Sequence, residues 1–513
     1  MWKEKVMSLN GRSNQTYHQI QLIFTFAVIS TMLFTPLALG QDRNVEGLVQ
    51  GVWSRDYSPY YVIGDIEVPN TGELYIQPGV EVIFLGNYIF EVRGLLLAEG
   101  DSTEGNRIRM TSELAIPWWG LSFNNCNIQS TVINCDIVNA WTGIDCINSF
   151  LRIERNRIDA RNVGINCVAS SPDIVDNRLI SVSENNNPFA SLRAINLHDG
   201  SSPRIEHNER IKCIAGAGGE AYGIYAQEYS SPLIKENWIE VISNTTAVGI
   251  SISELNYLIT ERNIIRVSSV REMKGLETRD ATGIEFFHND VILYGTSLEF
   301  AAGLSIQSGS RITITNNIVL GNFHSIGLDA SYGTVVQGSG YNDLCRHTEN
   351  YRGDWQGNND IYSDPLFVSE NENSNEAYCL NKNSLCIDAG NPVFPNDPDG
   401  TICDIGRYWF IPPDDDTLRV DLSRTVADYK LLSAQPNPFN RTTILSFTPR
   451  STGQGSLMLY DLRGRRLQTI WSGLLTSDMH RIPWQAMGCP AGEYIVRLES
   501  LGETGSFKLI LLP

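Results

Sequence analysis

The chain has 513 residues, 43 of them glycine, and a formal net charge of −19. This length allows two or three ordinary domains, or one elongated repeat domain with an additional module. The charge is uneven, because residues 1–40 carry +2, residues 41–429 carry −25 and residues 430–513 carry +4, which together give −19. An acidic body repels nucleic acid and anionic lipid, so nucleic acid is not an expected partner and a polyanion would need a bridging cation.

The amino end predicts an export signal over residues 1–40. Lys3, Lys5 and Arg12 precede an apolar run from Ile20 to Gly40 that closes in the small-x-small sequence Ala-Leu-Gly, the pattern that signal peptidase reads. The alternative is a retained membrane anchor, because about 20 apolar residues can span a bilayer. The small residues at the end of the run favour cleavage, so we expect a secreted or outer-surface protein.

The segments before the repeats predict short strands. Residues 65–100 and 118–140 contain apolar stretches of four to six residues separated by Gly, Pro and Asn. Such stretches are typical of strands in a sheet-rich coil. Residues 41–64 are expected to cap its first turn, which would otherwise expose unpaired backbone groups.

Two phrases recur between residues 143 and 317. One is Gly or Ala followed by Ile or Leu, and the other places an apolar residue three positions before an Asn, as in "SSPLIKENWIEV" (Ser230 to Val241). The first phrase precedes the second by 13 or 14 residues in all six units that contain both. The six first positions are Gly143, Gly164, Ala194, Gly223, Gly249 and Gly303, and the matching asparagines are Asn156, Asn177, Asn208, Asn237, Asn263 and Asn317.

The units predict a solenoid of stacked turns. Their short alternating apolar stretches indicate two or three brief strands per turn, and the variable distance between units indicates loops inserted at one corner. Adjacent turns would lie about 4.8 Å apart, so equivalent side chains would form ladders. A buried Asn amide needs hydrogen-bond partners, and we therefore expect the repeated Asn to be an inward structural ladder.

One outward ladder is a candidate metal or binding site. Asp199, Glu228 and Glu254 each lie five residues after the Gly or Ala of their unit, so three carboxylates would stack about 5 Å apart. Like charges this close repel one another unless they are protonated, paired or bridged by a cation. Calcium takes six to eight oxygen ligands, so this ladder could bind calcium; the alternative is a solvated acidic edge.

Other polar residues of the same units are weaker candidates. His198 and Arg193 are of the types that a lyase uses as base and as carboxylate partner, and Tyr225 could contact a bound sugar. A second acidic cluster, Asp397, Asp399 and Asp404, lies in "NPVFPNDPDGTICDIG" (Asn391 to Gly406). Its spacing departs from the EF-hand pattern, and the alternative is a capping loop rich in Asx turns.

The ten cysteines predict no metal site. Their spacings do not match a zinc motif. Cys379 and Cys386 lie in one short segment and could pair in an exported protein. The cysteines inside apolar phrases are expected to be buried thiols that pack as small hydrophobic groups. These are Cys126, Cys135, Cys146 and Cys167.

The last part of the chain predicts a separate module. The acidic segment 411–430 reads as a linker, and residues 431–513 contain alternating strands with Gly turns. This pattern favours a β-sandwich of about seven strands.

Two resemblances follow from these motifs. The Gly-Ile and Ile-x-x-Asn phrases, with "YIQPGVEVIF" and "SLCIDAGNP", resemble the right-handed parallel β-helix repeat family, which implies an all-β solenoid over residues 65–410 with capping loops at its carboxyl end. Residues 431–513 resemble the type A C-terminal sorting domain of the type IX secretion system through "QPNPFN", "YDLRGR" and "GEYIVRL". Trp484-Gln485-Ala486 departs from the Trp-Asp-Gly that is usual there.

The resemblances imply a location more than an activity. The sorting domain implies that the type IX secretion machinery is a partner and that the protein is attached to the cell surface or released. The β-helix scaffold hosts lyases, hydrolases and adhesins. We expect a binding or structural module with a polysaccharide as ligand; the alternative is a calcium-dependent lyase of acidic glycans.

Overall fold

The computed structural model describes residues 44–511 except for 19 segments. The expected signal peptide and nearly all of the expected linker lie outside the described residues. The gaps are 104, 113–115, 185–190, 217, 255–256, 296, 298, 308, 331–333, 354, 411–429, 436–438, 440, 449–452, 461–465, 476–479, 487–488, 491 and 501–502.

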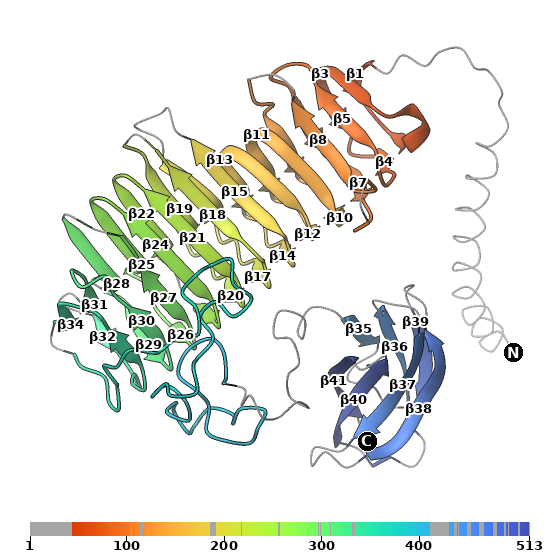
Figure 1. Cartoon of the computed structure of the whole chain (residues 1–513). Helices are drawn as coiled ribbons and strands as arrows, with labels where there is room; N and C mark the ends of the chain where they lie inside the picture. Colours follow the sequence, from red (N-terminus) through yellow and green to blue (C-terminus); the bar gives the residue numbers. More distant parts are fainter. Residues whose placement is uncertain are drawn as a thin grey trace, which may run out of the picture.

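The main body is a right-handed parallel β-helix. Its strands pair in parallel with the strand one turn earlier and one turn later, and they form three long sheets that we name A, B and C (Figure 1). In each central turn the chain passes through sheet A, then sheet B, then sheet C. Longer strands cross the corner from sheet C to sheet A and join these two into one 22-stranded sheet, whereas sheet B has 12 strands.

Sheets A and B have the following strands. Sheet A contains β6 (Ile89–Val92), β9 (Gly120–Asn124), β16 (Ser191–His198), β19 (Glu220–Ala226), β22 (Thr246–Ser253), β25 (Glu272–Arg279), β28 (Phe300–Ile306), β31 (Ile326–Ala330) and β34 (Glu349–Arg352). Sheet B contains β2 (Gly51–Trp53), β4 (Glu73–Ile76), β7 (Leu95–Glu99), β10 (Ser130–Ile133), β12 (Leu151–Glu154), β14 (Asp173–Val175), β17 (Arg204–Glu206), β20 (Leu233–Lys235), β23 (Leu258–Glu261), β26 (Ile284–Phe287), β29 (Arg311–Thr315) and β32 (Val335–Val336).

Sheet C and the longer strands complete the coil. Sheet C contains β5 (Glu81–Phe84), β8 (Ile108–Ser112), β15 (Leu179–Glu184), β18 (Ile211–Ala215), β21 (Trp238–Ser243), β24 (Ile264–Ser269), β27 (Asp290–Leu293), β30 (Ile318–Leu320) and β33 (Asp343–Cys345). The longer strands β3 (Tyr60–Val68), β11 (Cys135–Ile147) and β13 (Arg157–Val168) run through both sheets, and β1 (Asn44–Leu48) pairs with β3.

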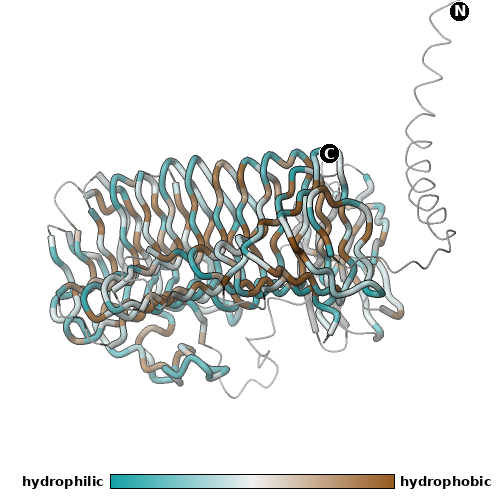
Figure 2. The backbone as a smooth tube through the Cα atoms, turned by 90° about the horizontal axis from the view of Figure 1, so that it is seen from above, coloured by the Kyte–Doolittle hydropathy of each residue, from teal (hydrophilic) through white to brown (hydrophobic). Residues whose placement is uncertain are grey.

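The core fills the inside of the coil. Side chains alternate between inward and outward along each strand, and the tube in Figure 2 accordingly alternates between apolar and polar residues along the stacked turns. The inward residues form one continuous apolar cluster from the first turns to Leu344. Cys126, Cys135, Cys146 and Cys167 are buried thiols in this cluster.

The first turn starts earlier than the sequence indicated. Residues 41–64 were expected to be a cap, but β1 and β2 already pair with the strands of the next turn, β3 and β4. A short 3₁₀ helix, η1 (Arg55–Tyr57), lies between β2 and β3. The difference arises because short polar strands at the open end of a coil lack the strict alternation that identifies strands elsewhere.

The repeated asparagines form a buried ladder at the corner between sheets B and C. Each one after Asn156 accepts hydrogen bonds at Oδ1 from both the backbone N–H and the Nδ2 of the preceding Asn; for Asn208 the donors are on Asn177, at 3.1 and 2.9 Å. Its own Nδ2 donates to the next Oδ1, that of Asn237, at 2.7 Å. The ladder contains Asn156, Asn177, Asn208, Asn237, Asn263, Asn289, Asn317 and Asn342.

The ladder ends in a carboxylate. Oδ1 of Asp360 accepts from the backbone N–H of Asn342 at 2.7 Å and from its Nδ2 at 3.1 Å. A carboxylate has no N–H to satisfy, so Asp360 closes the row without leaving a buried donor. Its other oxygen accepts a hydrogen bond from Tyr351.

The Gly-Ile phrase is explained by close approach of the backbone. A Cβ on Gly249 would lie 2.5 Å from the carbonyl oxygen of Gly275, one turn later, and would overlap Cγ2 of Ile265. A Cβ on Gly223 would meet the oxygen of Gly249 at the same distance. The repeated use of Gly or Ala at this position of each unit therefore reflects packing between turns.

Irregular segments between residues 355 and 410 cover the carboxyl-terminal part of sheet C. Tyr378 and Ala377 pack on Ile264, Ile292 and Leu320. A second cluster joins Leu380, Cys386 and Ile405 to Ile318. All ten cysteines are among the described residues and all are free, so Cys379 and Cys386 do not pair.

Three carboxyl groups are enclosed beneath or within this covering. Asp290 is 1% exposed; its Oδ1 accepts from the backbone N–H of Arg407 at 3.0 Å, and its Oδ2 has no partner among the described residues. Burial raises the pKa of Asp290 to about 7. The hydrogen bond from Arg407 and its positive charge act in the opposite direction, but burial has the larger effect. Burial likewise raises the pKa of Asp343 and of Asp404 to about 7.

Asp290→Asn is expected to raise the melting temperature at about pH 8 and to change it little at about pH 5. The folded carboxyl has a pKa of about 7, above its ordinary value of 3.8, so the folded state binds more protons than the unfolded state within that window. Stability therefore falls as pH rises from about 4 to about 7, and the amide removes the buried charge that causes this fall. Thermal melts at the two pH values test the expectation.

The exposed Asp56→Asn is the control for this experiment, because Asp56 lies at the surface in η1. It should leave the pH dependence of the melting temperature as it is in the wild type. An equal shift for Asp290→Asn at both pH values would contradict the argument.

The carboxyl-terminal unit is a two-sheet antiparallel β-sandwich of seven described strands. One sheet contains β35 (Lys430–Gln435), β36 (Thr442–Thr448) and β39 (His480–Gln485). The other contains β38 (Arg466–Leu475), β37 (Gly453–Tyr460), β40 (Gly492–Ser500) and β41 (Glu503–Leu511). Phe439, Phe447 and Trp484 are buried in its own core. Among the described residues, no helix is long and apolar enough to cross a membrane.

Candidate functional site

The corner between sheets A and B presents a row of outward polar side chains. Asp199, Glu228 and Glu254 have φ values of 53°, 54° and 55°, so each occupies the left-handed conformation that turns the chain from one sheet to the next. Asp280, with a φ of 49°, occupies the same position in the following turn. The sequence-based alignment did not include Asp280, although Asp280 lies five residues after Gly275 and Gly275-Leu276 matches the repeated phrase.

A second buried ladder holds this corner from inside. The backbone N–H of Ser170 donates to Oγ of Ser201 at 3.1 Å, and that of Ser149 donates to Oγ of Ser170 at 3.0 Å. The first Ser of each "SSP" phrase therefore belongs to this serine ladder, and the Asn that follows it belongs to the asparagine ladder at the corner between sheets B and C. This arrangement fixes the corner residues on successive turns.

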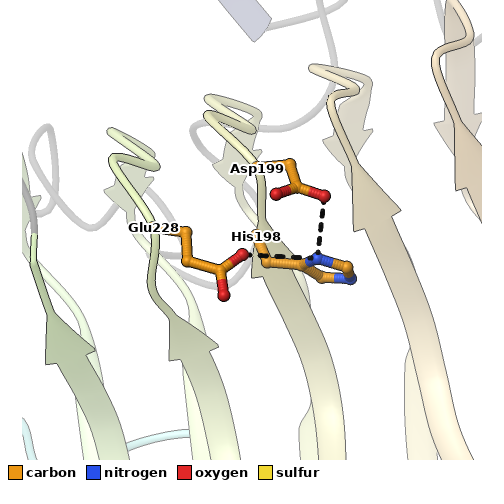
Figure 3. Close-up of side chains that lie close together, drawn as sticks. All are labelled: His198, Asp199 and Glu228. Carbon is orange, nitrogen blue, oxygen red and sulfur yellow. Dashed lines mark ion pairs between the residues drawn. The ribbon is translucent and has the colours of Figure 1, made fainter.

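His198, Asp199 and Glu228 converge at the corner (Figure 3). Nδ1 of His198 lies 3.4 Å from Oδ2 of Asp199 and 3.8 Å from Oε2 of Glu228. The imidazole is largely covered, at 25% exposure, whereas the two carboxylates are about half exposed. A protonated His198 can pair with both acids, and a neutral His198 can share a cation with them.

These three residues are the described group whose possible metal-ligand atoms lie within 4.8 Å of one another. The carboxylate oxygens suit calcium, whereas an imidazole nitrogen is a ligand for softer divalent ions such as zinc. Glu254, expected in the same metal site, lies at the equivalent corner one turn after Glu228 but is outside this group. A calcium ion here would therefore have fewer protein oxygens than the predicted three-carboxylate ladder supplies.

Arg193 and Tyr225 contact each other on the outer face of sheet A. The guanidinium carbon of Arg193 lies 4.5 Å from the ring centroid of Tyr225 and 6.0 Å from that of Tyr222. The two rings are edge to face, with centroids 5.1 Å apart. Nε of Arg193 is buried and has no hydrogen-bond partner among the described residues.

Arg193 and His198 contact different groups. Both lie on β16, five residues apart, so about 16 Å of strand separates their backbone positions. Arg193 contacts the two tyrosines, whereas His198 contacts the two acids of the corner. The sequence suggested that they lie together because both belong to one repeat unit, and it did not show that one strand, β16, contains both.

Between these positions runs a row of hydrogen-bonding side chains that we name the polar strip. Nδ2 of Asn196 donates to Oδ1 of Asn166 at 2.7 Å, and Nδ2 of Asn166 donates to Oδ1 of Asp145 at 2.8 Å. Burial raises the pKa of Asp145. In the strand register the strip contains Asp145, Asn166, Asn196, Tyr225, Ser251, Glu277, Ser305 and Asp329.

A groove of about 430 Å³ lies at the carboxyl-terminal end of the strip. Nζ of Lys274 lies 2.7 Å from Oε1 of Glu277 and 5.7 Å from the ring centroid of Phe300. Sequence reasoning missed this groove because its residues come from three different turns. Its lining residues are Glu272, Lys274, Phe300, Ser305, Ile306, Gln307 and Asp329.

No family model matches the sequence. No curated protein matches it either. Among solved structures, the chain is similar to a crystal structure of pectate lyase Pel9A, with 13% identity and a TM-score of 0.37 over 66% of this chain and 89% of that chain. The β-helix assignment rests on the parallel sheets described above, and no activity is transferred from that enzyme.

The second predicted calcium cluster is held by backbone groups. Oδ2 of Asp397 accepts from the N–H of Asp404 at 2.8 Å, and Oδ1 of Asp404 accepts from the N–H of Asp388 at 2.8 Å. Oδ1 of Asp399 accepts from the N–H of Thr401 at 2.9 Å. The bond between Asp399 and Thr401 is that of an Asx turn, whereas the bonds of Asp397 and Asp404 join residues that lie 7 and 16 positions apart.

Proposed function

We propose that this protein is an exported β-helix protein that binds a polysaccharide along sheet A. The polar strip is the observation that carries the proposal. It presents amide, hydroxyl and carboxylate groups at the spacing of successive turns, includes the ring of Tyr225 with Arg193 beside it, and ends in a groove. Hydrogen-bonding groups next to an aromatic ring are the chemistry that recognises sugars.

A glycan array, followed by calorimetry with the glycans that bind, tests the proposal. Tyr225→Ala removes the ring that contacts Arg193, and we expect at least about tenfold weaker binding, since 1.4 kcal/mol corresponds to a factor of ten. Thr131→Ala, on the outer side of sheet B, is the control and should bind as the wild type does. Equal binding by both variants, or no glycan bound by the wild type, would contradict the proposal.

The corner group favours a second candidate function, cleavage of acidic glycans by a metal-assisted lyase. His198 could act as base, and Asp199 and Glu228 could hold the cation that neutralises a uronate. Ultraviolet absorbance of unsaturated uronate products, measured with calcium, with zinc and with a chelator, tests this candidate. Loss of the signal in Glu228→Gln but not in Glu261→Gln would support it, and absence of product in the wild type would exclude it.

We further propose that residues 431–513 direct export through the type IX secretion machinery. The sandwich has its own core, so its removal should leave the β-helix folded. A chain truncated after residue 429 is expected to remain in the periplasm, measured by cell fractionation with circular dichroism as the folding control. Secretion of the truncated chain at the wild-type level would refute this role.

A further inference from the structure

A compact cluster of charged side chains lies on the outer face of sheet C, away from the polar strip. Glu240 of β21 is 2% exposed and accepts from three cations. Nη1 of Arg266 lies 2.7 Å away, Nζ of Lys212 lies 3.0 Å away and Nη1 of Arg210 lies 3.2 Å away. Three cations around one carboxylate leave a local excess of two positive charges in a strongly acidic body.

A second carboxylate from a distant segment enters this cluster. Glu372, in the covering over sheet C, pairs with Arg266 and lies 3.8 Å from Nη1 of Arg210. Its side chain is 27% exposed, so it reaches the cluster from the solvent side. Glu372 thereby occupies a position where a carboxylate is favoured by two guanidinium groups.

Aromatic rings border the same cluster. The guanidinium of Arg210 lies 4.8 Å from the ring centroid of Trp238, and that of Arg266 lies 4.5 Å from that of Tyr294. Nε of Arg266, whose side chain is 10% exposed, has no hydrogen-bond partner among the described residues, and neither does Nε1 of Trp238. Two buried donors next to the cluster thus have no partner among the described residues while Glu372 pairs with Arg266.

We infer that Arg210, Lys212 and Arg266 form a binding site for the carboxylate of an acidic sugar, and that Glu372 closes this site until such a ligand displaces it. The inference does not rest on the proposed function, because its residues lie on sheet C. A polymeric ligand is favoured because the neighbouring strand β15 presents half-exposed Ser181 and Ser183 beside Lys212 and Ile214, which extends the surface beyond the cations.

The test uses calorimetry on the secreted full chain with trigalacturonate as the probe. Glu372→Gln removes the competing charge, and we expect it to bind trigalacturonate at least about tenfold more tightly than the wild type. Adding Lys212→Met should abolish this gain. Glu370→Gln is the matched control, because Glu370 lies in the same segment but pairs with Arg346 at 3.1 Å, and it should bind as the wild type does.

Acetate and a neutral trisaccharide distinguish the ligand sources. We expect acetate to bind more weakly than trigalacturonate, and the neutral sugar to show no difference between the wild type and Glu372→Gln. Acetate that binds as tightly as the oligomer would overturn the assignment to a sugar. Equal trigalacturonate affinity of the wild type and Glu372→Gln would overturn the site itself, and Glu372 would then be a structural ion pair.

A second measurement needs no variant. Saturating trigalacturonate should speed amide hydrogen exchange in residues 366–378 of the wild type, because the ligand displaces Glu372 from Arg266. Unchanged or slower exchange in this segment would contradict the displacement. The Tyr225→Ala variant of sheet A should retain the acceleration, which separates failure of this inference from failure of the proposed function.

Discussion

Asn208→Leu is expected to lower the free energy of unfolding by about 3 kcal/mol, the upper end of the cost of a buried unsatisfied group. The substitution removes the acceptor of Asn177 N–H and Nδ2, and the donor to Ile174 O, Glu206 O and Oδ1 of Asn237. Leucine has the same branching and the same number of side-chain non-hydrogen atoms and is not smaller than asparagine, so lost hydrogen bonds rather than a cavity dominate the effect. Urea unfolding followed by circular dichroism measures the loss.

Asn166→Leu is the matched control for this change. Asn166 also bonds to the turns on both sides of it, through Asp145 and Asn196, but it is only half-buried on the outer face of sheet A. Water can replace its partners, so we expect a loss of about 1 kcal/mol or less. Equal losses for the two variants would show that burial does not give the inner ladder its strength.

Gly249→Ala is expected to destabilise the coil by about 1–3 kcal/mol, the usual cost of overpacking a core. The new Cβ would lie 2.5 Å from the carbonyl oxygen of Gly275 and would overlap Ile265. Two neighbouring turns would have to move apart, which also lengthens the hydrogen bonds between them. Thermal melts and urea unfolding measure the effect.

Ala194→Gly is the reverse substitution at the same place in another turn. Ala194 is buried in the position that Gly223 and Gly164 occupy in the turns on either side. Because the structure already accommodates its Cβ, its removal should cost about 0.5–1 kcal/mol through backbone entropy. A Gly249→Ala variant as stable as the wild type would show that the turns can separate freely.

The repeated positions were predictable because repetition itself is a signal. Asn177, Asn208 and Asn237 recur at a fixed distance from a Gly or Ala, and a solenoid places such residues on one ladder. Asn289 fits the same two phrases, because it lies 14 residues after Gly275 and three residues after Phe286, so it was equally predictable although it is not among the six units named above. The all-β class and the solenoid followed from strand patterns alone.

The functional residues were less predictable because they depend on contacts that sequence distance hides. Glu372 meets Arg266 across more than 100 positions, and no periodicity indicates this pairing. Asp397 and Asp404 resembled a calcium loop in composition, but their backbone partners could be identified only in three dimensions. His198 was singled out as a base, whereas its contacts with Asp199 and Glu228 depend on the exact corner geometry.

The Asn ladder also bears on how such a chain can change over generations. Adjacent members are separated by as few as 21 and as many as 31 residues, yet each pair makes the same side-chain bond. The stacking of one turn on the next is therefore set by the ladder contact and not by the number of residues in the turn. Insertions and deletions outside the ladder positions leave the rise per turn unaltered, so relatives of this chain should align at their ladders and diverge in length between them.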